Sequence, residues 1–323
     1  MADARVAVSP PATTPPRVSR RNAPGRRPLA PSQALPAAWR GMLYMALAAL
    51  AMVTMHALVR QLSTELHPFQ IAFFRNLFGL AFVVPLLARE GLAQLRPRRP
   101  GLLLLRGASD AGAMMAFFTA LSLAPLATVT ALSFTAPLFA TILAVPLLRE
   151  VVGLRRALSV AAGFAGALIV IRPGAEGLVT AGAAATLLSA CFWGLALCLI
   201  KLLSRTETSV AITFYAAATL VPVTLVAALP VWRTPSPEVL GWLVLIGALG
   251  TVGQLSISQA MRLADATVVM PLDFTRLLWS AVLGFVLFAE VPDAATFVGG
   301  TVIFASVVYI AYRERARHHQ PVL

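Results

Sequence analysis

Charged residues are scarce in this sequence. They make up 12% of its 323 residues and apolar residues make up 59%, against about 25% and about 45–50% in average soluble domains. Because the surface of a soluble fold needs charge, this composition excludes a soluble globular protein, and the apolar content excludes a disordered chain. The two cysteines, Cys191 and Cys198, would lie about 10 Å apart along one helix, which is too far for a disulfide bond.

Signatures of catalysis are missing as well. The sequence contains no GxSxG, HExxH, CxxC or GxxxxGK[ST] motif, and no loop with paired carboxylates. Without a nucleotide-binding loop the protein cannot hydrolyse ATP, so any work that it performs must come from ion or solute gradients. We therefore expect no enzyme activity, no cofactor and no metal site.

Long apolar runs fill the chain from Gly41 onward. Each run covers about 15–25 residues, the length that crosses a hydrocarbon core of about 30 Å. The runs do not alternate apolar with polar residues, as barrel strands would, and a helix satisfies its own backbone hydrogen bonds in lipid. We therefore predict an all-α membrane protein with ten transmembrane helices, at residues 41–60, 69–88, 101–123, 126–148, 155–171, 180–203, 209–231, 239–261, 266–288 and 294–312.

The segment before the first run, residues 1–40, contains eight prolines, seven arginines and one acidic residue. Proline breaks helices and the segment has no apolar periodicity, so we expect a disordered, basic cytoplasmic tail. It lacks the apolar core and cleavage site of a signal peptide, and its Pro-Pro pairs disfavour the amphipathic helix of a transit peptide. Residues 315–323 are expected to form a short second tail in the cytoplasm.

The net charge of +13 is distributed unevenly along the chain. With the N-terminus in the cytoplasm, the inside segments hold twenty Lys and Arg residues, whereas the outside loops hold three, Arg60, Arg172 and Arg233. Positive residues concentrate on the cytoplasmic side of membrane proteins, so we expect both termini in the cytoplasm and the protein in the inner (plasma) membrane. The charge is therefore a topology signal, and no nucleic-acid partner is expected.

The two halves of the chain resemble each other. When residues 120–150 are aligned with residues 260–290, eleven of 31 positions are identical. The identities include two Phe-Thr pairs, which begin at Phe134 and Phe274, and such pairs are harder to match by chance than leucine or alanine. This similarity indicates an internal duplication.

Two aligned glutamates, Glu150 and Glu290, indicate how the duplicated units are oriented. Each ends a predicted span, where we expect it to cap a loop or pair with a nearby arginine. Five spans separate them, and a unit with an odd number of helices inserts in inverted orientation when it is duplicated. The chain is therefore predicted to contain two inverted five-helix repeats, residues 41–174 and 180–314.

Four stretches carry a family resemblance: FFRNLFGL at 73–80, ALSLAPLATVTALSFTAPLFATILAVPLLRE at 120–150, GFAGALIVIRPG at 163–174 and PLDFTRLLWSAVLGFVLFAEVPD at 271–293. In them the chain resembles the EamA family of the drug/metabolite transporter superfamily, over about residues 41–314. The resemblance implies a ten-helix bundle of two inverted repeats that carries small metabolites. Within the family the chain is similar to the bacterial branch that includes riboflavin and S-adenosylmethionine carriers.

Each ionisable residue inside a span raises the free energy of membrane insertion by about 2.5–3.5 kcal/mol. Such residues are therefore expected to have a structural or functional role. Asp273 and Arg276 lie three residues apart near the middle of the ninth span, on one face of the helix. They form either a self-contained ion pair or a cavity-facing pair that exchanges partners when solute binds. Pro271, just before the pair, and Pro137, in the matching fourth span, are candidate hinges, with a simple packing kink as the alternative.

Further charged candidates lie in the second and third spans. Asp110 is about nine residues inside the third span, one turn beyond Arg106. It either pairs with Arg106 or lines the cavity and pairs with Arg75 of the second span. Arg75, beside Asn76, either binds a substrate anion or has a structural role. Protonation of Asp110 or Asp273 could couple protons to transport.

Other polar and aromatic side chains complete a candidate pocket. Ligand sites have mostly apolar walls with a few placed polar groups, and four residues fit this description: Trp193, Tyr215, Gln254 and Trp279. Both tryptophans lie mid-span, which favours a cavity or core position over an interface anchor. His56 is expected to be a structural histidine, with a proton relay as the alternative. Close helix packing is predicted at the glycine stripe of residues 247, 250 and 253.

These features favour a secondary-active carrier for a small metabolite, such as an amino acid, a nucleoside or a vitamin-like solute. It would work by alternating access, with a binding site at the midplane between the repeats. Its partners would be the solute, the lipid bilayer and protons, and an oligomer is compatible with the sequence. A membrane-embedded enzyme for a lipid-linked substrate would need catalytic residues clustered at one interface, and a passive channel would need a polar lining along a whole span.

Overall fold

The computed structural model describes residues 31–88, 97–149, 153–172, 180–207, 209–264, 269 and 272–318. Within these residues the regular elements are helices and there is no strand, which confirms the predicted all-α class. In chain order the elements are α1 (Pro31–Leu62), α2 (Pro68–Ala88), α3 (Pro100–Leu123), α4 (Leu126–Ser133), α5 (Ala136–Leu148), α6 (Leu154–Ile171), α7 (Ala181–Leu203), α8 (Ser209–Ala228), η2 (Leu229–Val231), α9 (Pro237–Leu263), α11 (Thr275–Phe288) and α12 (Ala294–His318).

Several of these helices are suited to cross a membrane. Each of the ten predicted spans overlaps at least one helix of the described residues. Two apolar segments are short, Thr275–Phe288 and Ala294–Ile310. Seven segments of the described chain are long and apolar enough to cross a membrane: Trp39–Leu62, Pro100–Leu123, Leu126–Leu148, Leu154–Ile171, Ala181–Leu203, Phe214–Val231 and Pro237–Leu263.

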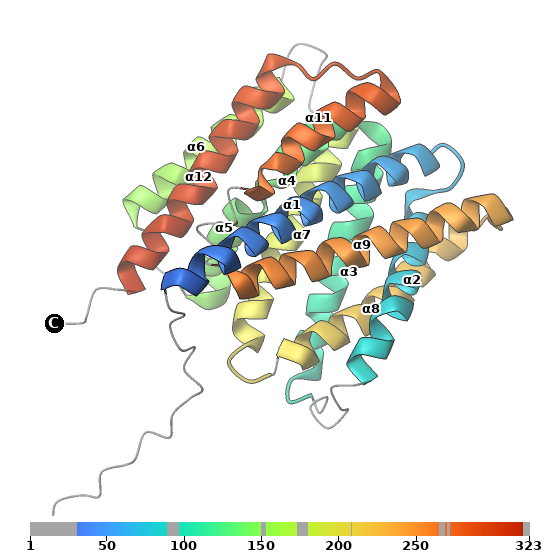
Figure 1. Cartoon of the computed structure of the whole chain (residues 1–323), viewed down its shortest axis with the longest axis horizontal. Helices are drawn as coiled ribbons and strands as arrows, with labels where there is room; N and C mark the ends of the chain where they lie inside the picture. Colours follow the sequence, from blue (N-terminus) through green and yellow to red (C-terminus); the bar gives the residue numbers. More distant parts are fainter. Residues whose placement is uncertain are drawn as a thin grey trace, which may run out of the picture.

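Both ends of the helical region extend beyond the predicted boundaries. α1 begins at Pro31, so the disordered tail predicted for residues 1–40 is wrong for residues 31–40. Proline is compatible with the first position of a helix because its missing N–H would have no partner there. α12 continues to His318, so the predicted tail at 315–323 begins inside a helix. The start of α1 and the end of α12 lie at the same end of the bundle (Figure 1).

Local capping sets where two helices of the second half begin. The hydroxyl of Ser236 accepts a hydrogen bond from the backbone N–H of Val239 at 3.3 Å, at the start of α9. The hydroxyl of Thr180 accepts one from Ala183 at 3.3 Å, at the start of α7. These caps satisfy backbone groups that would otherwise lack partners, so both helices begin within two residues of their predicted starts.

The fourth span is interrupted near its middle. α4 ends at Ser133 and α5 begins three residues later. Pro137 explains the interruption because it has no N–H to donate to the carbonyl of Ser133. The backbone tightens instead into an i→i+3 turn, in which the N–H of Thr135 donates to the carbonyl of Leu132 at 3.0 Å.

The ninth span has a matching irregularity at the second Phe-Thr pair. α11 begins directly after Phe274, and the N–H of Leu277 donates to the Phe274 carbonyl at 3.0 Å. Pro271, the other candidate hinge, lies outside the described residues. The rings of Phe134 and Phe274 are 5.5 Å apart, so the two interruptions meet inside the bundle.

The helices pack in close pairs: α1 along α9, α3 along α7, and α6 along α12. The pair of α6 and α12 lies at one edge of the bundle, and α2 and α8 lie at the opposite edge (Figure 1). Glycines permit the closest approaches. A Cβ added at Gly299 of α12 would lie 2.5 Å from the carbonyl oxygen of Gly166 in α6. At Gly247 of the predicted stripe it would lie 2.6 Å from the Cβ of Phe78.

Candidate functional site

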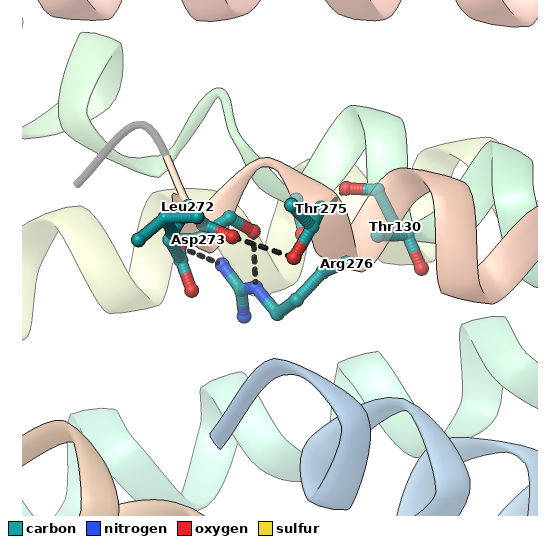
Figure 2. Close-up of polar contacts among 6 residues, drawn as sticks. Thr130, Leu272, Asp273, Thr275 and Arg276 are labelled. Atoms are coloured by element: carbon teal, nitrogen blue, oxygen red, sulfur yellow. Dashed lines mark hydrogen bonds and ion pairs between the residues drawn. The ribbon is translucent and has the colours of Figure 1, made fainter. Parts of the chain in front are cut away.

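The ninth span presents an ion pair at its interruption. Nη2 of Arg276 lies 2.6 Å from Oδ2 of Asp273, and both side chains are about four-fifths buried, with 20% and 23% of their area exposed. The guanidinium carbon of Arg276 lies 5.1 Å from the ring centroid of Phe134, which is a cation–π contact. Figure 2 shows both side chains on the side of α11 that faces α1. The predicted pairing is therefore present, and it contacts the interruption of the fourth span.

Arg75 lies in the second span and approaches the middle of α9. A Cβ added at Gly250, the central residue of α9, would lie 3.0 Å from both Nε and Nη2 of Arg75. Nη1 donates a hydrogen bond to Oδ1 of Asn76 at 3.1 Å. The amide nitrogen of Asn76 is buried and has no hydrogen-bond partner among the described residues. His56 of α1 is close enough to interact electrostatically with both Arg75 and Arg276.

Asp110 pairs within its own helix. Its Oδ2 lies 3.2 Å from Nη2 of Arg106, one turn earlier in α3. Arg106 also donates from Nη1 to the carbonyl of Ile212 in α8 at 3.4 Å. Of the two pairings predicted for Asp110, the structure therefore shows the one with Arg106 and not the one with Arg75.

The remaining pocket candidates lie at different depths in the bundle. Trp193 of α7 and Trp279 of α11 are 47% and 39% exposed, so neither is buried in the core. Gln254 of α9 is exposed, on the turn that follows Gly250. Tyr215 of α8 is partly buried and packs against a small apolar cluster formed by residues of α3, α7 and α8.

A second ion pair, between Arg60 and Glu290, links helices at one end of the bundle. Arg60, in the last turn of α1, pairs with Glu290 just after α11 and donates to the carbonyl of Ala124 at the end of α3. The other carboxylate oxygen of Glu290 accepts from the N–H of Leu126, the first residue of α4, at 3.0 Å. This cluster joins four helices, α1, α3, α4 and α11. The sequence analysis expected Glu290 to cap a loop or to pair with a nearby arginine, and it did not identify Arg60, which is one of the three outside arginines.

Two cavities lie at the same end as this cluster. One of about 240 Å³ is bordered by Glu290, Gly284 and Ser280 on one side and by Thr128 on the other. A larger one of about 460 Å³ lies between the α1–α2 loop and residues 230–233. Among the described residues, His, Cys, Asp and Glu nowhere form a group of three that could hold a metal ion.

Charged side chains held in pairs within a bundle of apolar helices, several of them long enough to cross a membrane, define the chain as a multi-pass membrane protein. Comparison with known proteins gives the family. The model of the EamA-like transporter family matches residues 39–172 and again residues 180–312. The chain belongs to this family, so it is a transporter of small molecules and not an enzyme.

Individual relatives and a solved structure agree with the family. An S-adenosylmethionine uptake transporter of Rickettsia bellii is 31% identical over 79% of this chain and 88% of its own length. A riboflavin transporter of Vibrio cholerae is 30% identical over 85% of this chain and 94% of its own length. A crystal structure that is 18% identical superposes with a TM-score of 0.54, covering 90% of this chain and all of the other, and supports the fold alone.

Proposed function

We propose that the chain is a secondary-active carrier of the inner membrane that works by alternating access between two inverted five-helix repeats, residues 41–174 and 180–314. Its solute would bind near the midplane, where the interruptions of the fourth and ninth spans meet. The observation that carries this proposal is the meeting of a charged pair, Asp273 and Arg276, with Phe134 of the other repeat.

The helix neighbours support a twofold relation between the repeats. When the repeats are exchanged, α1 corresponds to α7, α3 to α9 and α5 to α11. The pair α1–α9 then corresponds to α7–α3, and the pair α1–α11 corresponds to α7–α5. All four pairs are in contact. Glycine contacts repeat in the same way. A Cβ at Gly41 would lie 2.8 Å from Ala264, and one at Gly182 would lie 2.5 Å from Ala124. Helices of one repeat that make the same contacts as the matching helices of the other repeat can exchange positions when the carrier changes conformation.

The charges and the position of the helix ends support an orientation with both termini in the cytoplasm. The start of α1 and the end of α12 lie at one end of the bundle (Figure 1), which fits two cytoplasmic termini. Lys and Arg are concentrated in the segments that this topology places inside. The cluster of Arg60 and Glu290 would then fasten the outer end, as a carrier needs when its site opens to the cytoplasm.

The site would combine Asp273 and Arg276 with Arg75 and Asn76. A solute that bears charge or hydrogen-bonding groups would compete for the ion pair, and protonation of Asp273 would release Arg276 and couple a proton to transport. The same coupling role is proposed for Asp110, which has Arg106 as its partner. The interruptions beside Pro137 and Pro271 would act as hinges. The pocket would be extended by Trp193, Tyr215, Gln254 and Trp279.

Proteoliposomes test this function with the solutes named for the relatives, S-adenosylmethionine and riboflavin. We expect uptake of one solute to be accelerated by the same solute inside the vesicles, because an alternating-access carrier exchanges solutes and a channel does not. Uptake without such acceleration would contradict the proposed mechanism.

Two substitutions test the site itself. Asp273→Asn and Arg276→Ala should each abolish transport while the protein folds, because either change removes the pair that solute engages. The matched controls are Glu238→Gln and Arg262→Ala, which alter exposed residues of α9 and should leave transport unchanged. Full activity in both site variants would contradict the assigned site.

A further inference from the structure

We propose that Arg75 and Asn76 form a subsite for a carboxylate group of the solute. This proposal rests on the proposed function, since it assigns one part of the same binding site and names the chemical class that the site accepts. It is carried by three observations: no carboxylate of the described residues balances the charge of Arg75, a neighbouring amide donor has no partner among them, and a glycine makes room for the guanidinium.

The unbalanced charge distinguishes Arg75 from the other arginines inside the bundle. Arg60 pairs with a glutamate, and Arg106 and Arg276 each pair with an aspartate. No described carboxylate pairs with Arg75, whose hydrogen bond goes to the neutral amide of Asn76. A cation held inside a membrane protein without a counter-charge is costly, and such residues mark the path of a substrate.

The unused donor is the amide nitrogen of Asn76. This side chain belongs to a residue that is 6% exposed, and its oxygen already accepts from Arg75 at 3.1 Å. The nitrogen is buried without a partner, although a buried donor left unpaired costs about 1–3 kcal/mol. Arg75 and Asn76 therefore present N–H donors and a positive charge from adjacent positions of α2, the donor set that a carboxylate requires.

The space for this arrangement comes from α9. A Cβ at Gly250 would lie 3.0 Å from Nε and from Nη2 of Arg75, and 3.0 Å from the sulfur of Met55. Glycine at this position therefore lets the guanidinium reach the centre of a 27-residue helix, about 20 Å from its first residue. The arginine is thus placed at depth, where a headgroup at the membrane surface does not reach.

The charge balance selects a single negative charge. Asp273 and Arg276 neutralise each other, so Arg75 leaves a charge of +1 among these three groups. A carboxylate neutralises it, whereas a phosphate with nearly two negative charges would leave an excess. The subsite is therefore expected to accept solutes with one carboxylate, and to discriminate against the same solutes when that group is removed.

Thermal stabilisation of the purified full-length protein tests this specificity. The probes are S-adenosylmethionine and its decarboxylated analogue, together with nicotinate and nicotinamide, which differ in carboxylate against amide. We expect at least one carboxylate to raise the melting temperature, and its partner without the carboxylate to bind about tenfold more weakly or worse. Three results would overturn the proposal. Both members of each pair could raise the melting temperature equally, sodium chloride alone could raise it as much, or no probe could raise it.

Two variants separate a solute site from a structural role. Asn76→Asp places a carboxylate next to Arg75, so it should raise the melting temperature of the solute-free protein and remove the shift caused by the carboxylate probe. Arg75→Gln should also remove that shift without lowering the solute-free melting temperature, whereas the control Arg262→Gln should keep it. A large loss of stability in Arg75→Gln, or an unchanged shift in either Asn76→Asp or Arg75→Gln, would contradict the subsite.

The outcomes also separate this proposal from the proposed function. Counterflow of riboflavin, which has no carboxylate, would show that the protein is a carrier, whatever the carboxylate probes do. If riboflavin is exchanged while no carboxylate binds, the subsite is wrong and the carrier function stands. If a carboxylate stabilises the protein but no solute is exchanged, the subsite stands and the mechanism of transport is wrong.

Discussion

The charged residues inside the bundle differ in how readily the sequence predicts their ion-pair partners. Asp273 with Arg276 and Asp110 with Arg106 are pairs three and four residues apart, so helical periodicity alone predicts both contacts. The partner of Glu290 is 230 positions earlier, at Arg60, and only the packing of α1 against α11 reveals it. Short-range pairing was thus predictable, whereas pairing between distant parts of the chain requires the three-dimensional arrangement.

The ion pair of Arg60 and Glu290 yields a prediction about stability. Glu290→Gln leaves Arg60 with a neutral partner at a site where both side chains are about four-fifths buried. We expect a loss of about 2 kcal/mol in the free energy of unfolding, together with easier opening of this end of the bundle. Denaturation in detergent measures the free energy of unfolding. The rate of alkylation of the variant Thr128→Cys measures the opening of this end of the bundle.

The exposed pair of Arg172 and Asp293 provides the control. Both side chains are about half exposed, at 48% and 49%, so Arg172→Gln should change the free energy of unfolding by about 0.5 kcal/mol or less. Equal effects of Arg172→Gln and Glu290→Gln would show that burial does not strengthen the pair of Arg60 and Glu290.

Individual elements were predicted well in position and less well in detail. All ten predicted spans overlap helices, and seven segments of the described residues have the length and hydropathy of a transmembrane helix. The extension of α1 to Pro31 was missed, because proline was taken as a helix breaker although it is compatible with a first turn. Pro137 was predicted as a hinge, with a packing kink as the alternative, and the interruption falls two to three residues earlier, where the carbonyl of Ser133 loses its donor.

The interruption of the fourth span yields a prediction about rates. In Pro137→Ala the new N–H can donate to the carbonyl of Ser133 and join α4 to α5 into one continuous helix. We expect the melting temperature to stay equal or rise and transport to slow by about tenfold, since the conformational change would lose a hinge. Pro222→Ala, at an exposed proline inside α8, should leave the transport rate unchanged. Normal transport by Pro137→Ala would mean that the interruption is only a packing kink.

The molecule as a whole depends on small residues where helices meet. A soluble protein can gain stability from burying apolar area, but lipid is as apolar as leucine, so a membrane bundle relies on close packing. The glycine stripe in α9 was predicted from its spacing, and the structure shows Gly247 and Gly253 against α2 and α1. The contact of Gly166 with Gly299 was not predicted, because it joins α6 to α12 across 133 positions.

Matched glycine substitutions test this dependence. Gly299→Ala would place a Cβ 2.5 Å from the carbonyl oxygen of Gly166, so the two helices must move apart. We expect a loss of about 2 kcal/mol in the free energy of unfolding, despite the better helix propensity of alanine. Gly241→Ala in α9 meets nothing within 4 Å and should be neutral or slightly stabilising. Thermal melting of both variants in detergent decides the comparison, and equal melting temperatures would contradict it.

The backbone contact between α6 and α12 also limits how the carrier can move. In the proposed arrangement each repeat supplies one helix to this contact, and sliding one helix past the other would force Gly166 and Gly299 apart. A rotation about an axis through this contact would keep it intact, and displacements would then grow with distance from that axis. The largest displacements should therefore occur at the far edge, where α2 holds Arg75 and α8 lies beside it.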